Sequence, residues 1–464
     1  MITFPEMRRA EINYSAFYGP LSDLMQRAGA SVAAEIKSMV PSGSKVLFLC
    51  GTGNNGGDGL TAAEMVRDCC SVKVIIVSLD GRVKSDLAQK ALSSYHGEME
   101  KLENLPSAIT WADLVVDAIL GTGTKPGLRE PVKSAINVVN SSGKAVLSID
   151  LPSGLGSEEA IKPIRTVTFT DTKEGMTPNN SGMIVIRDIG IPASCFNHSG
   201  PGDFVYYPLP LSSSHKGMNG ELSVIAGWES YGAGVISSKA ALSTGIDLVK
   251  VYLPPTMIDR FASHSVEFML REYDQKYIEQ ISKSSAILIG PGLGTGDDRS
   301  EMIHGILERY TGPIVLDADA LKIMRPEVLK GKNAVITPHR KEFEIFTGLD
   351  PTEENAISSA QRYGFTVLLK GETDIITDGR MKIHSPGGNA RMTMGGTGDM
   401  LAGLVAGFVA KGMPSVRAAS FASYVNKASA DLCYVEKGYW YSVQDMLEKV
   451  PYVINSSLKL VGGA

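Results

Sequence analysis

The chain has 464 residues, 43% of them hydrophobic, and its 45 Lys and Arg residues oppose 50 Asp and Glu residues, which gives a formal net charge of -5 at pH 7. At about 150 residues per domain this length predicts roughly three domains, although one α/β domain can reach about 250 residues. The abundant aliphatic residues exclude collagen-like and mainly disordered chains. The scattered basic residues and the mild acidity argue against nucleic acid as a partner.

No apolar stretch approaches the length of about 18 residues that a membrane-spanning helix needs. The N-terminal segment is too polar for a signal peptide, so we expect a soluble cytoplasmic protein without a membrane partner. The cysteines are odd in number and form no C-x-x-C pair, which favours free thiols over a disulfide framework or a zinc site. They are Cys50, Cys69, Cys70, Cys195 and Cys433.

In the first half, short apolar runs alternate with helical patterns, which is typical of a parallel sheet covered by helices. The expected strands are 45–50, 72–77, 114–117, 145–149, 167–169 and 183–187. Helices are expected at 21–40 and, after a glycine-rich turn, at 60–68. This pattern predicts a doubly wound, Rossmann-like α/β domain, and the Pro- and Ser-rich stretch 206–215 predicts a linker after it.

The alternation begins again after this stretch. The expected strands are 222–226, 248–253, 286–289, 314–316, 334–336 and 367–370, and the last two helices are 397–411 and 415–435. The sequence therefore predicts two unequal α/β domains, residues 1–210 and 211–464.

Residues 45–66 are expected to form a strand, a glycine-rich turn and a helix. Such a turn directs backbone N–H groups at an anion, and the helix N-terminus adds positive potential. A tight turn without a ligand explains the G-x-G-x-x-G string equally well. The amides and the carboxylate within 54–58, however, supply oxygen ligands that a plain turn does not need. The N–H groups of the turn and the positive potential of the helix N-terminus favour a phosphate-bearing ligand.

Further polar residues follow two other strands of this half. Because the carboxyl ends of parallel strands share one crevice, we expect Asp117, the loop 121–127, Asp150 and Ser153 to converge with 54–58. Taken alone, Asp117 could equally be a helix cap or a buried hydrogen-bonded carboxylate. Lys125 alone could be a solvated loop residue.

Together, NNGGDG, VDAILGTGTKPGLREP and IDLPSG resemble the N-terminal epimerase domain of bifunctional NAD(P)H-hydrate repair enzymes, over roughly the first 200 residues. The resemblance implies a Rossmann-like fold and a potassium ion held by Asn55, Asp117 and Ser153. It also implies substrate contacts from Asn54, Asn55, Gly56, Gly57, Asp58, Gly121, Thr122, Gly123, Thr124, Lys125, Pro126, Gly127 and Asp150.

The substrate of that family, NAD(P)HX, carries a hydroxyl on the carbon beside the ring nitrogen. Its R and S epimers can interconvert by loss and return of the hydroxyl or by ring opening. Either route transfers a proton to or from oxygen, for which a carboxylate and a cationic partner are suited. We therefore expect Asp150 and Lys125 to act as acid and base.

In the second half, GGTGD precedes a helix rich in small residues, 397–411. Backbone N–H groups at the start of this helix can hold a developing negative charge, with Asp399 beside them as a base. The alternative is a glycine-rich helix N-terminus without a catalytic role.

Other motifs follow strands of the same domain, at 290–296, 316–321, 336–348 and 368–376. His339 follows a strand and Pro338, at the expected edge of the crevice, where a ligand role fits. Asp317 and Asp319 could form a metal pair or position neighbouring loops.

From His215 onward the chain resembles the ribokinase-like, ADP- or ATP-dependent NAD(P)HX dehydratase. The resemblance implies substrate contacts from Ala233, Gly292, His339 and Asp399. It implies nucleotide contacts from Lys370, Gly371, Glu372, Thr373, Asp374 and Gly398, and a homo-oligomer. In the expected reaction Asp399 deprotonates the substrate hydroxyl, which attacks the terminal phosphoryl group of ADP or ATP with Mg2+ neutralising charge. Loss of phosphate then restores the C=C bond.

Two alternatives stay open. The second domain could be a kinase of a small alcohol, such as a hydroxymethyl-pyrimidine or a thiazole alcohol, because the ribokinase-like fold supports both chemistries. The first domain could be a binding or scaffolding module without activity.

Overall fold

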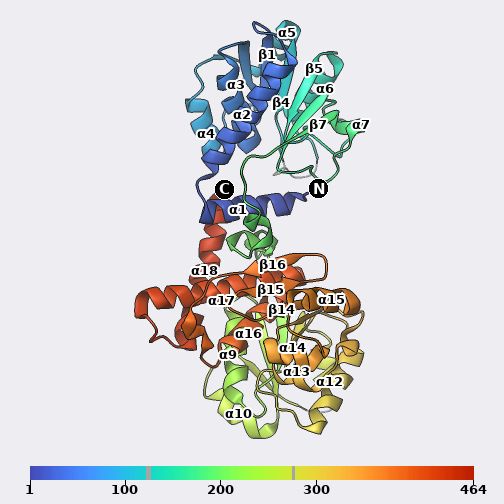
Figure 1. Ribbon diagram of the computed structural model, residues 1–464, viewed down its shortest axis with the longest axis vertical. Helices are drawn as coiled ribbons and strands as arrows, with labels where there is room; N and C mark the ends of the chain where they lie inside the picture. The colour runs from blue at the N-terminus through green and yellow to red at the C-terminus, as the bar shows by residue number, and fades with distance from the viewer. Residues whose placement is uncertain (122–126, 274–276, 464) are drawn as a thin grey trace. The chain divides into compact units, whose positions relative to one another are not determined.

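The computed structural model describes residues 1–121, 127–273 and 277–463. The chain divides into two compact units, Met1–Cys195 and Phe196–Ala464, which Figure 1 colours from blue to green and from green to red. The sequence put the boundary near residue 210, but the division falls at 195/196. The reason is packing, because Phe204 is buried in the core of the second unit and Tyr207 stacks on it at 4.8 Å.

The first unit contains a parallel sheet with strand order β3-β2-β1-β4-β5-β6-β7. Its strands are β1 (Lys45–Cys50), β2 (Ser71–Ile76), β3 (Glu98–Glu100), β4 (Leu114–Ala118), β5 (Ala145–Ile149), β6 (Arg165–Phe169) and β7 (Met183–Arg187). The order of the first six strands is that of a Rossmann-like doubly wound sheet, as the sequence predicts.

Helices cover this sheet because its central strands are apolar on both faces. The helices of this unit are α1 (Phe4–Phe17), α2 (Leu21–Met39), α3 (Asn54–Val66), α4 (Asp86–Ser93), α5 (Leu105–Trp111), α6 (Val132–Ser141) and α7 (Pro178–Ser181), with a short 3-10 turn at Leu102–Asn104. The short helix α8 (Ser194–Asn197) spans the point of the chain where the two units divide. Leu47 and Leu49 of β1 pack in one core with Ile109 of α5 and Ile136 of α6.

One expectation for this unit was wrong. The sequence placed 54–58 in a turn before a helix at 60–68, but α3 begins at Asn54, so these residues form its first turn and a half. The glycines are needed for close packing: a Cβ on Gly56 would lie 2.1 Å from the carbonyl oxygen of Gly51, and one on Gly59 would lie 2.5 Å from Cβ of Ala118. Helix α3 therefore lies directly against β1 and β4.

The second unit contains a larger sheet with strand order β10-β9-β8-β11-β12-β13-β14-β15-β16. The pairings are parallel up to β14, and β14, β15 and β16 are antiparallel. The strands are β8 (Glu221–Ile225), β9 (Leu248–Leu253), β10 (Met269–Glu272), β11 (Ala286–Ile289), β12 (Ile314–Leu316), β13 (Ala334–Ile336), β14 (Thr366–Leu369), β15 (Asp374–Thr377) and β16 (Lys382–Ser385).

The two faces of this sheet belong to different cores, since successive side chains of a strand point to opposite sides. Leu222 and Val224 of β8 pack with α9, α16, α17 and α18, whereas Ile225 packs with α12, α13, α14 and α15. The helices are α9 (Tyr231–Leu242), α10 (Pro255–Ala262), α11 (Tyr277–Ile281), α12 (Asp297–Arg309), α13 (Asp319–Ile323), α14 (Arg340–Thr347), α15 (Glu353–Tyr363), α16 (Thr397–Lys411), α17 (Ser415–Lys437) and α18 (Val443–Gly463). Short 3-10 turns lie at Pro201–Tyr206, Pro326–Leu329 and Ala390–Thr393. The result is a three-layer α/β/α unit.

Within the described ranges, no helix combines the length and the apolar character that crossing a bilayer would require.

Candidate functional site

The strand order of the first unit reverses between β1 and β4, and ligands of doubly wound sheets bind at such a reversal. Two residues on either side of it are in contact there. The side-chain amide of Asn55, in α3 after β1, donates a hydrogen bond of 2.9 Å to the carbonyl oxygen of Leu120, after β4. A Cβ on Gly121 would lie 3.0 Å from Cβ of Asn55. The predicted convergence of these two strand ends is therefore present.

Asp117, at the end of β4, is completely buried. Its carboxylate accepts hydrogen bonds from the Ser153 hydroxyl at 2.5 Å, the Ser153 N–H at 2.9 Å and the Ser148 hydroxyl at 2.8 Å. Burial raises the pKa of Asp117, and these hydrogen bonds oppose the rise. Asp117 is thus a buried, hydrogen-bonded carboxylate and not a helix cap. It fixes Ser153 beside Leu120, whose N–H donates a hydrogen bond of 2.8 Å to the Ser153 hydroxyl.

The side-chain oxygen of Asn55 is buried and has no hydrogen-bond partner among the described residues. An unpaired buried carbonyl oxygen is costly, and it is a ligand that a hard cation prefers. Asn54, its neighbour, instead accepts a hydrogen bond from Ser85. The two asparagines of the motif therefore have different surroundings.

Part of the expected substrate loop lies outside the described residues, namely Thr122, Gly123, Thr124, Lys125 and Pro126. The expected acid/base partner Lys125 is among them. Gly127 is described and has a left-handed backbone with φ of 94°.

Asp150 has a partner that the sequence did not indicate. The ammonium of Lys173 lies 2.6 Å from Oδ1 of Asp150, and the Lys173 side chain is fully buried. Lys173 follows β6 in the turn TDTKEGM, which belongs to none of the motifs identified in the sequence. Its position after a strand was the sequence feature that could have indicated a site residue. Asp150 itself has a left-handed backbone with φ of 65°, which is uncommon for a residue with a side chain.

Two further carboxylates lie close to Asp150. Burial, then Asp150, raises the pKa of Glu11 in α1 to about 7, against the opposing effect of Arg8. Burial, then Asp150 and Glu11, raises the pKa of Asp58 in α3 well above its ordinary value. The sequence singled out Asp58 but not Glu11, because α1 precedes the first motif by many residues.

In the second unit the strand order reverses between β8 and β11. The loops after these strands are joined by hydrogen bonds from the N–H groups of Glu229 and Ser230 to the carbonyl oxygen of Gly292, at 3.0 and 3.2 Å. A Cβ on Gly292 would lie 3.1 Å from that of Ala233. The structure thus brings together the two expected substrate positions Gly292 and Ala233.

Asp317 and Asp319 hold loops together. Asp317 is buried and accepts hydrogen bonds from the Thr337 hydroxyl at 2.8 Å and the Lys370 ammonium at 2.9 Å. Asp319 accepts from the N–H of Gly294 at 2.8 Å and pairs with Lys322. Among the described residues, no cluster of three or more His, Cys, Asp or Glu side chains could hold a metal ion.

Asp399 lies in the first turn of α16, whose N-cap Gly396 has a left-handed backbone. Burial raises the pKa of Asp399 to about 6, with Asp317 adding to the rise and Lys370 opposing it. Lys370 is also close to the start of α16, since a Cβ on Gly398 would lie 3.4 Å from its ammonium nitrogen. The arrangement places a base, a cation and the backbone N–H groups of a first helical turn close together.

His339 is the N-cap of α14. Its Nδ1 accepts hydrogen bonds from the N–H groups of Lys341 and Glu342, at 3.1 and 3.2 Å, and its side chain is 54% exposed. The structure therefore gives His339 a capping role at the crevice edge, and its contact with substrate stays a prediction.

Hydrogen bonds within the expected nucleotide loop 370–374 and from α17 hold this loop in place. The carboxylate of Asp374 accepts hydrogen bonds from the N–H of Gly371 at 2.9 Å and from the Ser423 hydroxyl at 2.6 Å. Lys427 of α17 donates 2.7 Å to the carbonyl oxygen of Glu372. Asp374 thus shapes the loop. Ser423 and Lys427 lie about 50 residues further along the chain, outside any motif.

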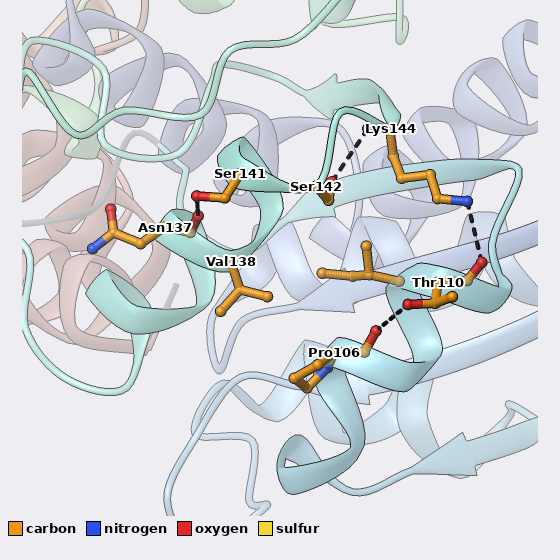
Figure 2. A pocket seen from close by; sticks show the side chains of 8 residues that line it. Pro106, Thr110, Asn137, Val138, Ser141, Ser142 and Lys144 are labelled. Carbon is orange, nitrogen blue, oxygen red and sulfur yellow. Dashed lines mark hydrogen bonds between the residues drawn. The ribbon is translucent and has the colours of Figure 1, made fainter.

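A separate hollow of about 570 Å³ lies between α5 and α6 (Figure 2). It is lined by Pro106, Ile109, Thr110, Asn137, Val138, Ser141, Ser142 and Lys144. Lys144, just before β5, donates to the carbonyl oxygens of Thr110 and Ala112. The hollow therefore opens at the amino ends of the strands, away from the expected site residues.

The two units match two protein families. Residues 222–452 match the family described as NAD(P)H-hydrate dehydratase, and residues 21–175 match the one described as YjeF-related protein N-terminus. A solved ribokinase-like superfamily protein from Enterococcus faecalis has the fold of the second unit, with a TM-score of 0.51 and 22% identity over 56% of this chain and 96% of that one.

Two curated relatives are similar over nearly the whole chain. The bifunctional NAD(P)H-hydrate repair enzyme Nnr of Methanothermobacter thermautotrophicus is 36% identical over 97% of this chain and 94% of its own length. The enzyme of the same name from Hyperthermus butylicus is 34% identical over 94% of this chain and 89% of its own. With both units matched in order and at this identity, the chain belongs to the family of bifunctional NAD(P)H-hydrate repair enzymes.

Proposed function

We propose that the first unit interconverts R- and S-NAD(P)HX and that the second dehydrates S-NAD(P)HX to NAD(P)H at the expense of ADP or ATP. The observation that carries the proposal is the group formed by Asp399, Lys370 and Asp317 at the start of α16. A base with a pKa near 6 beside a cation suits the removal of a hydroxyl proton near neutral pH. Homo-oligomeric assembly and a cytoplasmic location stay predictions from the sequence.

The first unit has residues that fit a potassium ion. The buried, unpartnered side-chain oxygen of Asn55 is available as a ligand, and the Ser153 hydroxyl and the Asp117 carboxylate lie beside Leu120 in the same crevice. These residues, Asn55, Asp117 and Ser153, would hold the ion. When bound, it would supply positive charge next to the buried carboxylate and the substrate.

For epimerisation we assign Asp150 as the group that exchanges a proton with the substrate hydroxyl. It follows β5, and its side chain is 13% exposed, so substrate can reach it. The predicted partner Lys125 lies outside the described residues, and its role stays part of the proposal. The loop 121–127 and the start of α3 would bind the substrate through backbone N–H groups.

For dehydration, Asp399 takes the proton of the substrate hydroxyl, and the oxygen attacks the terminal phosphoryl group of ADP or ATP. Lys370 and the N–H groups at the start of α16 stabilise the negative charge of the transferred group. The phosphate then leaves with its C–O electron pair while the ring nitrogen donates its lone pair, and loss of a proton from the adjacent carbon restores the C=C bond. The products are NAD(P)H, phosphate and AMP or ADP.

The residues around Asp399 also fit Mg2+. This ion is usually held by one or two carboxylates together with substrate phosphates, not by a cage of protein ligands. Asp317 and Asp319, which raise the pKa of Asp399, are carboxylates of this kind, and they would hold the ion with the nucleotide. When bound, Mg2+ would neutralise charge on the phosphoryl group.

The test is incubation of mixed R- and S-NADHX with the full chain, K+, Mg2+ and either ADP or ATP, while absorbance at 340 nm is followed. We expect complete conversion of both epimers. Conversion of about half of the mixture would leave the first unit as a binding or scaffolding module. Recovery of a stable phosphorylated alcohol without NADH would favour the kinase.

A further inference from the structure

Lys173 is among the largest fully buried side chains of the protein. Its ammonium contacts Oδ1 of Asp150 at 2.6 Å, the Thr168 hydroxyl at 3.0 Å and the carbonyl oxygens of Phe169 and Asp171 at 2.9 and 3.3 Å. An ammonium has three N–H donors, and here protein oxygens account for all of them. Lys173 therefore has no donor left for a substrate.

The backbone around Asp150 directs its side chain at this lysine. The left-handed φ of 65° turns the chain at the end of β5, and the N–H of Asp150 donates 2.7 Å to the carbonyl oxygen of Val167 in β6. Strained backbone of this kind persists where surrounding contacts fix it. Among the described residues, Oδ2 of Asp150 has no hydrogen-bond partner, so one carboxylate oxygen is held and the other is available.

The turn that carries Lys173 is itself fixed. Ile2 pairs with Lys173 as an isolated bridge, with the N–H of Ile2 donating 2.8 Å to Thr172 and the N–H of Glu174 donating 3.1 Å to Ile2. The same N-terminal segment continues into α1. Helix α1 brings Glu11 near Asp150.

The charged groups around Asp150 come from three elements. Lys173 follows β6, Glu11 lies on α1 and Asp58 lies on α3. Arg8 is 3.9 Å from Glu11. Burial together with this crowding of carboxylates raises the pKa of both Glu11 and Asp58. The buried ammonium compensates the charge of Asp150 in these surroundings.

We propose that Lys173 is a positioning residue for epimerisation, which holds Oδ1 of Asp150 and thereby fixes the other carboxylate oxygen as the base that opens the substrate ring. The proposal rests on the proposed function of the first unit. It assigns to Lys173 the pairing that the sequence assigned to Lys125. It takes ring opening as the route because the available oxygen of Asp150 can accept the hydroxyl proton.

In this step the substrate ring opens and closes again without an oxidant or a reductant. Asp150 takes the hydroxyl proton, the O–H electron pair forms an aldehyde C=O bond, and the bond from that carbon to the ring nitrogen breaks. The electron pair passes to the nitrogen, where it is conjugated with the ring C=C bond and the carboxamide. Rotation about the adjacent C–C bond presents the other face of the aldehyde, the nitrogen adds to it, and Asp150 returns the proton to oxygen.

The experiment measures epimerisation by the full chain in four forms: wild type, Lys173→Met, Asp150→Asn and the double variant. In Lys173→Met we expect kcat to fall about tenfold or more while KM changes little, because the substrate still binds but its base is no longer held in position. In the Asp150→Asn background the same substitution should change kcat less than about twofold, because Lys173 acts through Asp150. The matched control Lys162→Met, on an exposed lysine of the same unit, should behave as wild type.

Dehydration of S-NADHX by each variant shows that the second unit is intact, and the thermal unfolding curve reports on the first. If Lys173→Met does not fold, Thr168→Val, which removes a buried hydroxyl that contacts the same ammonium, should show a smaller change in the same direction. An unchanged kcat, or an equal loss of kcat with and without Asp150, would overturn the role of Lys173. Wild-type epimerisation in Asp150→Asn would instead overturn the assignment of Asp150 under the proposed function.

Discussion

The ammonium of Lys370, directly after β14, lies 2.9 Å from Oδ1 of Asp317, directly after β12. Strand β13 separates these two strands in the sheet, and Thr337, directly after β13, donates to the same oxygen at 2.8 Å. Burial lowers the pKa of Lys370, but Asp317, Glu342 and Asp399 raise it by more. The pair therefore provides a permanently charged cation at the carboxyl edge of the sheet, next to the start of α16.

Replacing Lys370 with Met should abolish most dehydration. The substitution removes the cation beside the transferred phosphoryl group, for which we expect a loss of about 100-fold in kcat. It also removes an interaction that lowers the pKa of Asp399, so the acid limb of the remaining activity should move to higher pH. The exposed Lys330→Met is the matched control, and an equal rate in the two variants would exclude the role of Lys370.

The wild-type pH profile tests the base directly. Burial, then Asp317, raises the pKa of Asp399 to about 6, and the base must be deprotonated to act. Dehydration should therefore increase with pH through a midpoint of about 6 and level off above it, when kcat is measured with saturating nucleotide. A rate that stays constant from pH 5 to pH 7, about one unit on either side of that midpoint, would contradict a base with this pKa.

Many strands could be predicted from the sequence, and some important contacts could not. Strands such as β1 and β11 are continuous β-branched and aliphatic runs that end at glycine, so the local pattern sets their bounds. The start of α3 was placed too late because glycine disfavours helices, and the packing of Gly56 on Gly51 overrides that preference. The antiparallel strands β15 and β16 were missed because their sequences, DIIT and KIHS, mix polar and apolar residues and form no continuous apolar run.

The same distinction holds for the sites. Asp117, Asn55 and Asp399 stand at strand or helix ends within glycine-rich motifs, where sequence alone indicates a ligand. Lys173 and Lys427 have no such motif, because their roles depend on tertiary contacts with Asp150 and with the loop 370–374. The roles of such residues can be recognised only from the folded structure.

The glycine at position 56 should be sensitive to a single methyl group. Because a Cβ there would lie 2.1 Å from the Gly51 carbonyl oxygen, Gly56→Ala should lower the free energy of unfolding of the first unit by about 1–3 kcal/mol. Gly305→Ala, in α12, has open space at its Cβ and should raise the free energy of unfolding by about 0.5–1 kcal/mol. Denaturant unfolding measures both, and an equal change in the two variants would contradict the tight packing of α3.

The potassium concentration that epimerisation needs should increase when Asn55 is replaced. In Asn55→Leu the unpartnered side-chain oxygen is lost, so half-maximal epimerisation should need about tenfold more K+ or more, while dehydration of S-NADHX stays unchanged. The exposed Asn137→Leu on α6 is the control. Equal potassium titrations in wild type and Asn55→Leu would show that the ion, if needed, is held elsewhere.

The most direct test of two separate sites on one chain is the pair of activities in Asp399→Asn. With mixed R- and S-NADHX, K+, Mg2+ and ADP or ATP, the folded variant should lose dehydration by about 100-fold or more, the usual contribution of a general base. Chromatography of the same sample should show R and S epimers interconverting at the wild-type rate. Loss of both activities in a variant that unfolds like wild type would contradict the assignment of the two reactions to two units.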